Sequence, residues 1–129
     1  MLAIDTNVLV RFLVDDDQEQ FLHAQRLIER EPTFIADTVL LESEWVLRNG
    51  YAFDALTFVE AIRAVAGLPT VALESPRRIA TALAWREQGL DFGDALHLAG
   101  ASACDAFLTF DRRLAKAAAR FGAGTVRAP

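Results

Sequence analysis

Four acidic residues stand where the sequence predicts that a strand gives way to a helix, or within the helix that follows. They are Asp5, Glu42, Asp94 and Asp111. Parallel strands end along one edge of a sheet, and ligands of open α/β proteins bind at that edge. If the four segments share one sheet, their carboxylates converge there. A cluster of oxygen ligands without thiols suits a hard divalent cation such as Mg²⁺ or Mn²⁺.

Three of these acids also have an ordinary structural explanation. Asp5 and Asp111 follow predicted strands and could cap the helices that begin after them. Asp94 comes three residues after Asp91, a spacing typical of a capping box. Capping and metal binding therefore both stay open for these positions when each is taken alone.

Two glutamates on the predicted helix after the second strand are expected to have different surroundings. Glu42 has the apolar neighbours Val39 and Trp45 at helical spacing, and no base lies three or four residues away. A carboxylate on an apolar face needs a partner from elsewhere in the fold or a cation. Glu44 has Arg48 four residues later, so we expect an ordinary exposed ion pair there.

Strand-like apolar segments alternate with helical segments along the chain, without a repeat or a linker-like stretch. We expect strands at residues 2–5, 33–36, 70–73 and 106–110, with a short fifth strand over 124–127. Such alternation favours a parallel sheet covered by helices on both faces. The predicted fold class is α/β, a three-layer α/β/α sandwich with a parallel sheet of four to five strands, in a single domain of residues 1–129.

The acidic and basic residues are unevenly distributed over a chain of net charge −5. Residues 1–60 carry twelve acids and four bases, whereas residues 61–129 carry six acids and nine bases. A net negative charge argues against a nucleic-acid partner, but the excess of bases in the second half weakens that objection. Nearly all the bases are arginines, which suit bidentate contacts to phosphate.

No uncharged apolar run approaches the roughly 20 residues that span a bilayer, so we expect no membrane segment. The chain enters a predicted strand at once, without a basic segment or a cleavage site. These features predict a cytoplasmic protein. The one cysteine, Cys104, lies among alanines in a helical stretch and is expected to be a buried thiol.

Four short pieces, in this order, carry a resemblance that covers essentially the whole chain. They are Ile4–Asn7, Leu40–Leu47, Asp91–Ala99 and Leu108–Leu114. With these pieces the chain resembles PIN-domain ribonucleases, most closely the VapC-type toxins of prokaryotic toxin–antitoxin pairs. The resemblance implies a PIN-like fold and hydrolysis of RNA phosphodiester bonds to leave 5′-phosphate ends.

The resemblance places Asp5, Glu42, Asp94 and Asp111 on the family's acidic metal-binding quartet, with Asp5 and Asp94 as the residues expected to ligate directly. Thr6 or Asn7 falls on the polar position that supports the first aspartate. The implied cofactor is Mg²⁺ or Mn²⁺, one or two ions. Asp91 is expected to cap a helix and His97 to be packed or hydrogen-bonded, although a site role for either stays open. His23 has no context that suggests a role.

Arginine and lysine residues must supply affinity for the RNA backbone. Arg112, Arg113 and Lys116 come directly after Asp111, and Arg11 and Arg48 are further candidates. The implied substrate is a structured RNA such as transfer or ribosomal RNA.

The resemblance also implies a homodimer and a cognate VapB-like antitoxin. The apolar helices predicted over residues 39–47 and 53–65 are candidate dimer surfaces, and the second of them carries a stripe of Phe58, Ile62 and Val65.

Other protein classes are compatible with parts of the pattern. A haloacid-dehalogenase phosphatase needs a second aspartate where Asn7 stands, and both it and a receiver domain need a suitably placed lysine. The chain's one lysine, Lys116, lies inside a predicted helix. A non-catalytic PIN-like module that binds RNA or acts as a scaffold stays open as the alternative function.

Overall fold

The computed structural model describes residues 1–129, in which five short strands alternate with seven helices. The chain folds as two compact units, an N-terminal unit of Met1–Pro76 and a C-terminal unit of Arg77–Pro129. Each unit contains its own set of paired parallel strands. The single domain expected over residues 1–129 stays a prediction.

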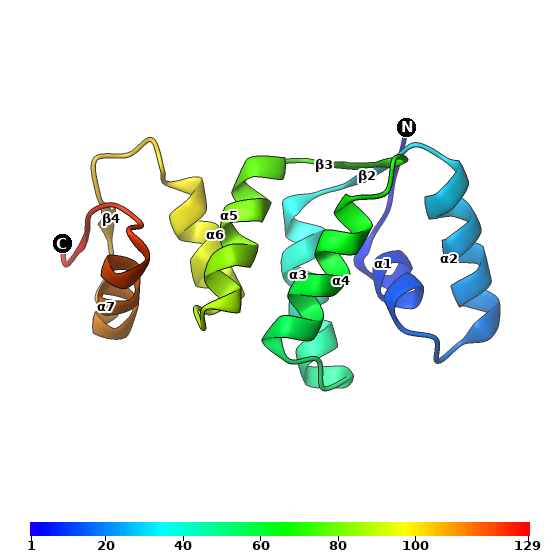
Figure 1. Ribbon diagram of the computed structural model, residues 1–129, viewed down its shortest axis with the longest axis horizontal. Coiled ribbons are helices and arrows are strands. Elements are labelled where there is room, and N and C mark those ends of the chain that lie inside the picture. The colour runs from blue at the N-terminus through cyan, green and yellow to red at the C-terminus, as the bar shows by residue number, and fades with distance from the viewer. The chain divides into compact units, whose positions relative to one another are not determined.

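The N-terminal unit is organised around a parallel sheet of three strands in the order β1-β2-β3 (Figure 1). The strands are β1 (Leu2–Ala3), β2 (Thr33–Ile35) and β3 (Val71–Leu73). Phe34 of β2 pairs with Ala3 on one side and with Ala72 on the other. Thr33 and Ile35 are completely buried, as the central strand of a parallel sheet requires.

Four helices connect and cover these strands. They are α1 (Thr6–Leu13), α2 (Gln18–Arg30), α3 (Asp37–Gly50) and α4 (Ala55–Ala66). Helix α1 packs against both α2 and α3 and lies between them in Figure 1. The stripe of Phe58, Ile62 and Val65 on α4 is buried in the core. The expectation that this stripe forms a dimer surface is therefore wrong, because its side chains are used within the chain.

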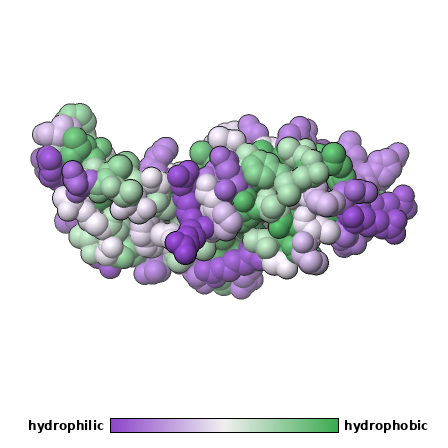
Figure 2. All heavy atoms as spheres, turned by 90° about the horizontal axis from the view of Figure 1, so that it is seen from above, coloured by the Kyte–Doolittle hydropathy of each residue, from purple (hydrophilic) through white to green (hydrophobic).

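Helix α2 has one buried face and one hydrophilic face. Ala24 and Ile28, four residues apart, are buried, whereas Glu19, Arg26 and Glu29 are exposed. Figure 2 shows the hydrophilic surface of α2 at the right, beside a more hydrophobic surface over the rest of the N-terminal unit. The amphipathic pattern thus fixes which face of α2 packs towards α1.

The C-terminal unit contains three helices and a pair of parallel strands. After α5 (Pro76–Glu87), which begins at the boundary between the units, come α6 (Phe92–Gly100), β4 (Phe107–Leu108), α7 (Arg112–Phe121) and β5 (Val126–Arg127). Helix α7 ends at Gly122, whose left-handed φ of 67° is readily adopted by glycine. Phe92 and Ala95 of α6 are completely buried.

The five predicted strands are found, each shorter than expected, but the sheet of four to five strands is not. Strand β4 pairs with β5, with Phe107 opposite Val126 and Leu108 opposite Arg127. The five strands therefore form a three-stranded and a two-stranded sheet. The parallel α/β character is as expected, and the three-layer arrangement stays a prediction.

The apolar stretch that includes Cys104 is less helical than expected. Helix α6 ends at Gly100, and residues 101–105 form turns in which the Cys104 N–H donates to the Ala101 carbonyl at 2.9 Å. Cys104 is exposed, so the expected burial of its thiol is wrong. None of the helices combines the length and the hydrophobicity needed to cross a membrane.

Candidate active site

Asp5 lies at the carboxyl end of the first strand and caps the helix that follows. Its Oδ1 accepts a hydrogen bond from the Val8 N–H at 3.2 Å, while its carbonyl accepts one from the Leu9 N–H at 3.3 Å. The side chain is exposed. The capping role expected for Asp5 is therefore confirmed, and the carboxylate is accessible from solvent.

A hydrogen bond connects the residue after Asp5 to Glu42 on α3. The Thr6 hydroxyl donates to Glu42 Oε1, and Thr6 is itself buried with 9% of its surface exposed. Because Thr6 follows Asp5 directly, this contact holds the Glu42 carboxylate beside the start of α1. Two of the four predicted acids, together with the predicted supporting residue Thr6, thus belong to one local arrangement in the N-terminal unit.

The burial of the two α3 glutamates is the reverse of the expectation. Leu40, Glu44 and Leu47 lie on the buried face, and Glu44 is only 4% exposed. Its carboxylate pairs with Arg48 Nε at 2.9 Å. Glu42 is exposed, and Trp45 is 61% exposed. The partner of Glu44 was predicted correctly, but the face of α3 that meets the core was not.

A third strand-end carboxylate, Glu74, was missed by sequence reasoning. The residue before α3, Ala36, has no side-chain oxygen, and Glu74 Oε1 instead accepts a hydrogen bond from the Asp37 N–H at 2.9 Å. Glu74 follows β3 directly, as Asp5 follows shortly after β1. Its position directly after the third predicted strand is the sequence feature that could have identified it. Glu74 thus helps to fix the N-terminus of α3, on which Glu42 lies.

In the C-terminal unit, the charges of two aspartates, Asp91 and Asp111, act on a third, Asp94. Asp91 caps α6 by accepting from the Asp94 N–H at 3.1 Å, so its expected capping role is confirmed. Asp111 caps α7 by accepting from the N–H groups of Arg113 and Leu114. Partial burial raises the pKa of the Asp94 carboxyl above its usual value, and the charges of Asp91 and Asp111 raise it further, while His97 acts in the opposite direction.

A basic surface lies on the helix that Asp111 caps. Arg113, Lys116 and Arg120 line a shallow cavity of about 410 Å³ on α7. Their spacing of three and four residues puts them on one face of the helix. Arg120 was not among the predicted RNA-binding residues, although this spacing could have identified it. Arg112 is exposed at the start of the same helix.

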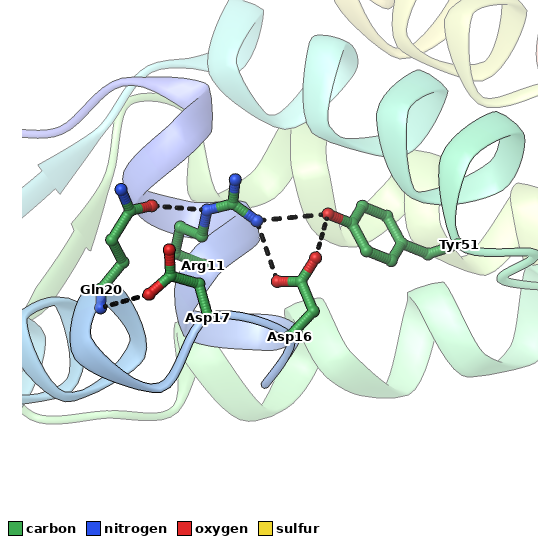
Figure 3. A network of polar contacts seen from close by, with 5 residues as sticks. All are labelled: Arg11, Asp16, Asp17, Gln20 and Tyr51. Carbon is green, nitrogen blue, oxygen red and sulfur yellow. Dashed lines mark hydrogen bonds and ion pairs between the residues drawn. The ribbon is translucent and has the colours of Figure 1, made fainter.

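The two other predicted RNA-binding arginines make contacts within the protein. Arg11 donates from Nε to Gln20 Oε1 at 2.7 Å, and from one terminal nitrogen to Asp16 at 2.8 Å and to the Tyr51 hydroxyl at 3.3 Å (Figure 3). The Tyr51 hydroxyl lowers the pKa of the Asp16 carboxyl, and the charge of Arg11 lowers it further. Arg48 pairs with Glu44. An RNA contact by Arg11 or Arg48 stays a prediction.

The side chains that could hold a metal ion fall into two groups. Asp5 and Glu42 lie in the N-terminal unit, and Asp94 and Asp111 lie in the C-terminal unit. In neither unit do three or more Asp, Glu, His or Cys side chains lie close enough together to hold a metal ion. The chemistry of the donors, carboxylates alone, fits Mg²⁺ or Mn²⁺. The convergence of all four carboxylates stays a prediction.

The sequence that forms these strand-end acids and capped helices is similar to a known protein family. The sequence model of the PIN domain matches residues 2–120, which is nearly the whole chain. No curated protein matches the chain significantly. The chain therefore belongs to the PIN domain family, whose members are typically nucleases.

Proposed function

We propose that this protein is a metal-dependent endoribonuclease. Asp5 and Asp94 would be the direct ligands of the metal ion, with Glu42 and Asp111 completing the site. The observation that carries the proposal is the match of residues 2–120 to the PIN domain, whose members are typically nucleases. The Asp94 carboxyl, partly buried beside the charges of Asp91 and Asp111, supports it. A fold maintains like charges at such a position at a cost in stability, and a bound cation removes that cost.

The contacts around the other two acids support the same roles. Thr6 donates to the Glu42 carboxylate through its hydroxyl and so holds it beside the start of α1. Asp5 and Asp111 use carboxylate oxygens to cap helices, which fixes the position of each carboxylate. Asn7 is exposed next to this arrangement and is the other candidate for the supporting polar position.

The chemistry would be hydrolysis of an RNA phosphodiester bond. When bound, one or two Mg²⁺ or Mn²⁺ ions would lower the pKa of an attacking water from about 15.7 towards neutrality and stabilise the departing oxygen. The protein's part is to orient the carboxylates and to bind the substrate. Arg113, Lys116 and Arg120 share one face of α7, where they would contact successive phosphates. Structured RNA such as transfer or ribosomal RNA is the proposed substrate.

We further propose that the protein acts as the toxin of a toxin–antitoxin pair, as a homodimer inhibited by a VapB-like antitoxin. The proposal rests on the four VapC-like sequence pieces. Exposed apolar side chains of α3 and α4 support a protein-binding surface in the N-terminal unit, among them Leu41, Trp45 and Leu56. Exposed apolar groups of this size are typical of surfaces that partners cover.

A non-catalytic RNA-binding or scaffold module is the second candidate. It is favoured by the helix caps, because capping alone accounts for the carboxylates of Asp5, Asp91 and Asp111. Capping does not account for Asp94, whose carboxyl lies beside two like charges.

The two candidates differ in what they predict for cleavage. Purified protein should be incubated with transfer and ribosomal RNA in Mn²⁺, with and without chelator, alongside Asp94→Asn. Asp105→Asn is the matched control, because Asp105 is an exposed aspartate of the same unit. We expect chelator-sensitive cleavage by the wild type and the control, and none by Asp94→Asn. RNA binding without cleavage at any metal concentration would support the scaffold.

A further inference from the structure

A pocket in the N-terminal unit adjoins Asp5 but is not explained by metal binding. It has a volume of about 380 Å³ and lies between the start of α1 and the middle of α2. Asp5, Asn7 and Arg11 line it from one side, and Gln20, His23 and Leu27 from the other. Its volume is within the range of small-ligand sites, which runs from roughly 300 to 1,000 Å³.

The walls of this pocket combine the groups that bind single bases in RNA. Unstacked bases bind by stacking on aromatic rings or guanidinium planes and by hydrogen bonds to their edges. His23 supplies a planar ring, Arg11 a guanidinium plane, and Leu27 an apolar wall. Asn7 and Gln20 supply amide groups. His23 and Gln20 are exposed, so a ligand can reach them.

The Gln20 amide is held in one orientation. Arginine has no hydrogen-bond acceptor, so the 2.7 Å contact from Arg11 Nε must be made to the Gln20 oxygen (Figure 3). The Asp17 carboxylate accepts from the Gln20 backbone N–H at 3.1 Å and fixes the backbone as well. Asp16 and Tyr51 hold the Arg11 guanidinium in turn. One lone pair of the Gln20 oxygen is therefore used by Arg11, and the NH₂ group is left as the donor for a ligand.

We propose that this pocket binds one unpaired base of the RNA substrate and prefers uracil or guanine, which carry a carbonyl at pyrimidine C4 or purine C6, over cytosine or adenine, which carry an amino group there. The proposal rests on the proposed ribonuclease function, because it places the base beside Asp5. At pyrimidine C4 or purine C6, the Gln20 NH₂ donates to the carbonyl oxygen of uracil or guanine, whereas it faces another donor in the amino group of cytosine or adenine. His23 stacks on the base, and the pocket thereby contributes to the choice of cleavage site.

Nucleotide binding can be measured without any cleavage, in chelator, by NMR of the imidazole signals. The chain has two histidines, of which His23 lines the pocket and reports on it. The probes are UMP, GMP, CMP and AMP. We expect UMP and GMP to shift the His23 signals at concentrations about tenfold lower than CMP and AMP do, because with CMP and AMP a donor–donor contact replaces the hydrogen bond from Gln20.

The substitution Gln20→Glu tests the orientation of the amide. Arg11 would hold one carboxylate oxygen and leave the other as an acceptor, so the preference should reverse towards CMP and AMP. Gln18→Glu is the matched control, since it makes the same charge change two residues earlier on the exposed start of α2. It should leave the preference unchanged.

The outcomes separate the pocket from the nuclease activity. Equal His23 shifts with all four nucleotides, no shift with any of them, or an unchanged preference in Gln20→Glu would overturn the base-binding proposal. Base-selective shifts in a protein that cleaves no RNA would support the pocket while contradicting the ribonuclease function. If the protein does cleave RNA, the cleavage sites mapped on random RNA should show the same base preference in the wild type, and Gln20→Glu should lose this preference.

Discussion

Replacing Thr6 by valine should weaken both the fold and the candidate site. The change removes the hydroxyl that donates to Glu42 but keeps the branched shape of a buried side chain. We expect a lower free energy of unfolding and a slower metal-dependent cleavage, because the Glu42 carboxylate is no longer held beside Asp5. Thr6→Ser keeps the hydroxyl and should restore most of the cleavage rate.

The magnitude follows from the burial of the two partners. A hydrogen bond to a charged group contributes about 1.5–3 kcal/mol. Glu42 is exposed, so water replaces part of the bond when the hydroxyl is removed. We therefore expect a loss of about 1 kcal/mol, which lowers the midpoint of thermal unfolding by about 4 °C in a chain of this size.

A double-mutant cycle with Thr6→Val and Glu42→Ala, followed by urea unfolding, isolates this contact. The coupling between the two changes should be about 1 kcal/mol. The same threonine-to-valine change at the exposed Thr57 of α4 is a control and should cost less than about 0.5 kcal/mol. A coupling below about 0.3 kcal/mol would refute the role of Thr6 in holding Glu42.

Three further changes test other parts of the structure. The folded state raises the pKa of Asp94 above its usual value of 3.8, so the free energy of unfolding of the protein falls as pH rises above 3.8. In metal-free protein, urea unfolding should therefore show Asp94→Asn becoming more stable relative to the wild type as pH rises above 3.8. A difference in free energy of unfolding that shrinks with rising pH would contradict this. Arg48→Met leaves the Glu44 carboxylate buried without its partner and should cost about 2 kcal/mol in urea unfolding; a cost near zero would show that the pair does not stabilise the fold. Lys116→Gln should reduce the slope of log affinity for RNA against log salt by about 0.7–0.9, whereas an unchanged slope removes Lys116 from the interface.

Local signals in the sequence were sufficient for the elements and for most helix caps. A strand followed by aspartate identified the starts of α1 and α7, and the three-residue spacing of Asp91 and Asp94 identified the start of α6. These contacts join residues two or three positions apart, so the sequence contains both partners in one short window. The family could also be identified from such windows because each surrounds one of the four acids.

Contacts between distant residues could not be predicted in the same way. Glu74 bonds to an amide 37 positions earlier, and Thr6 bonds to a carboxylate 36 positions later. Glu44 is buried and Glu42 exposed, contrary to expectation, because of the face of α3 that meets the core. The sequence did not identify this face, since both faces carry apolar residues. The pocket that contains His23 exists only because α2 packs on α1.

The most direct test of the central claim is the stabilisation of the protein by Mn²⁺ in Asp5→Asn and Asp94→Asn, made separately. Asp5 and Asp94 lie in different units, and the proposal requires both for one metal site. A ligand at a hundredfold excess over its Kd stabilises the native state by about 2.7 kcal/mol. We predict that Mn²⁺ raises the unfolding temperature of the wild type and that both variants lose this rise. A full rise in either variant would contradict a shared metal site.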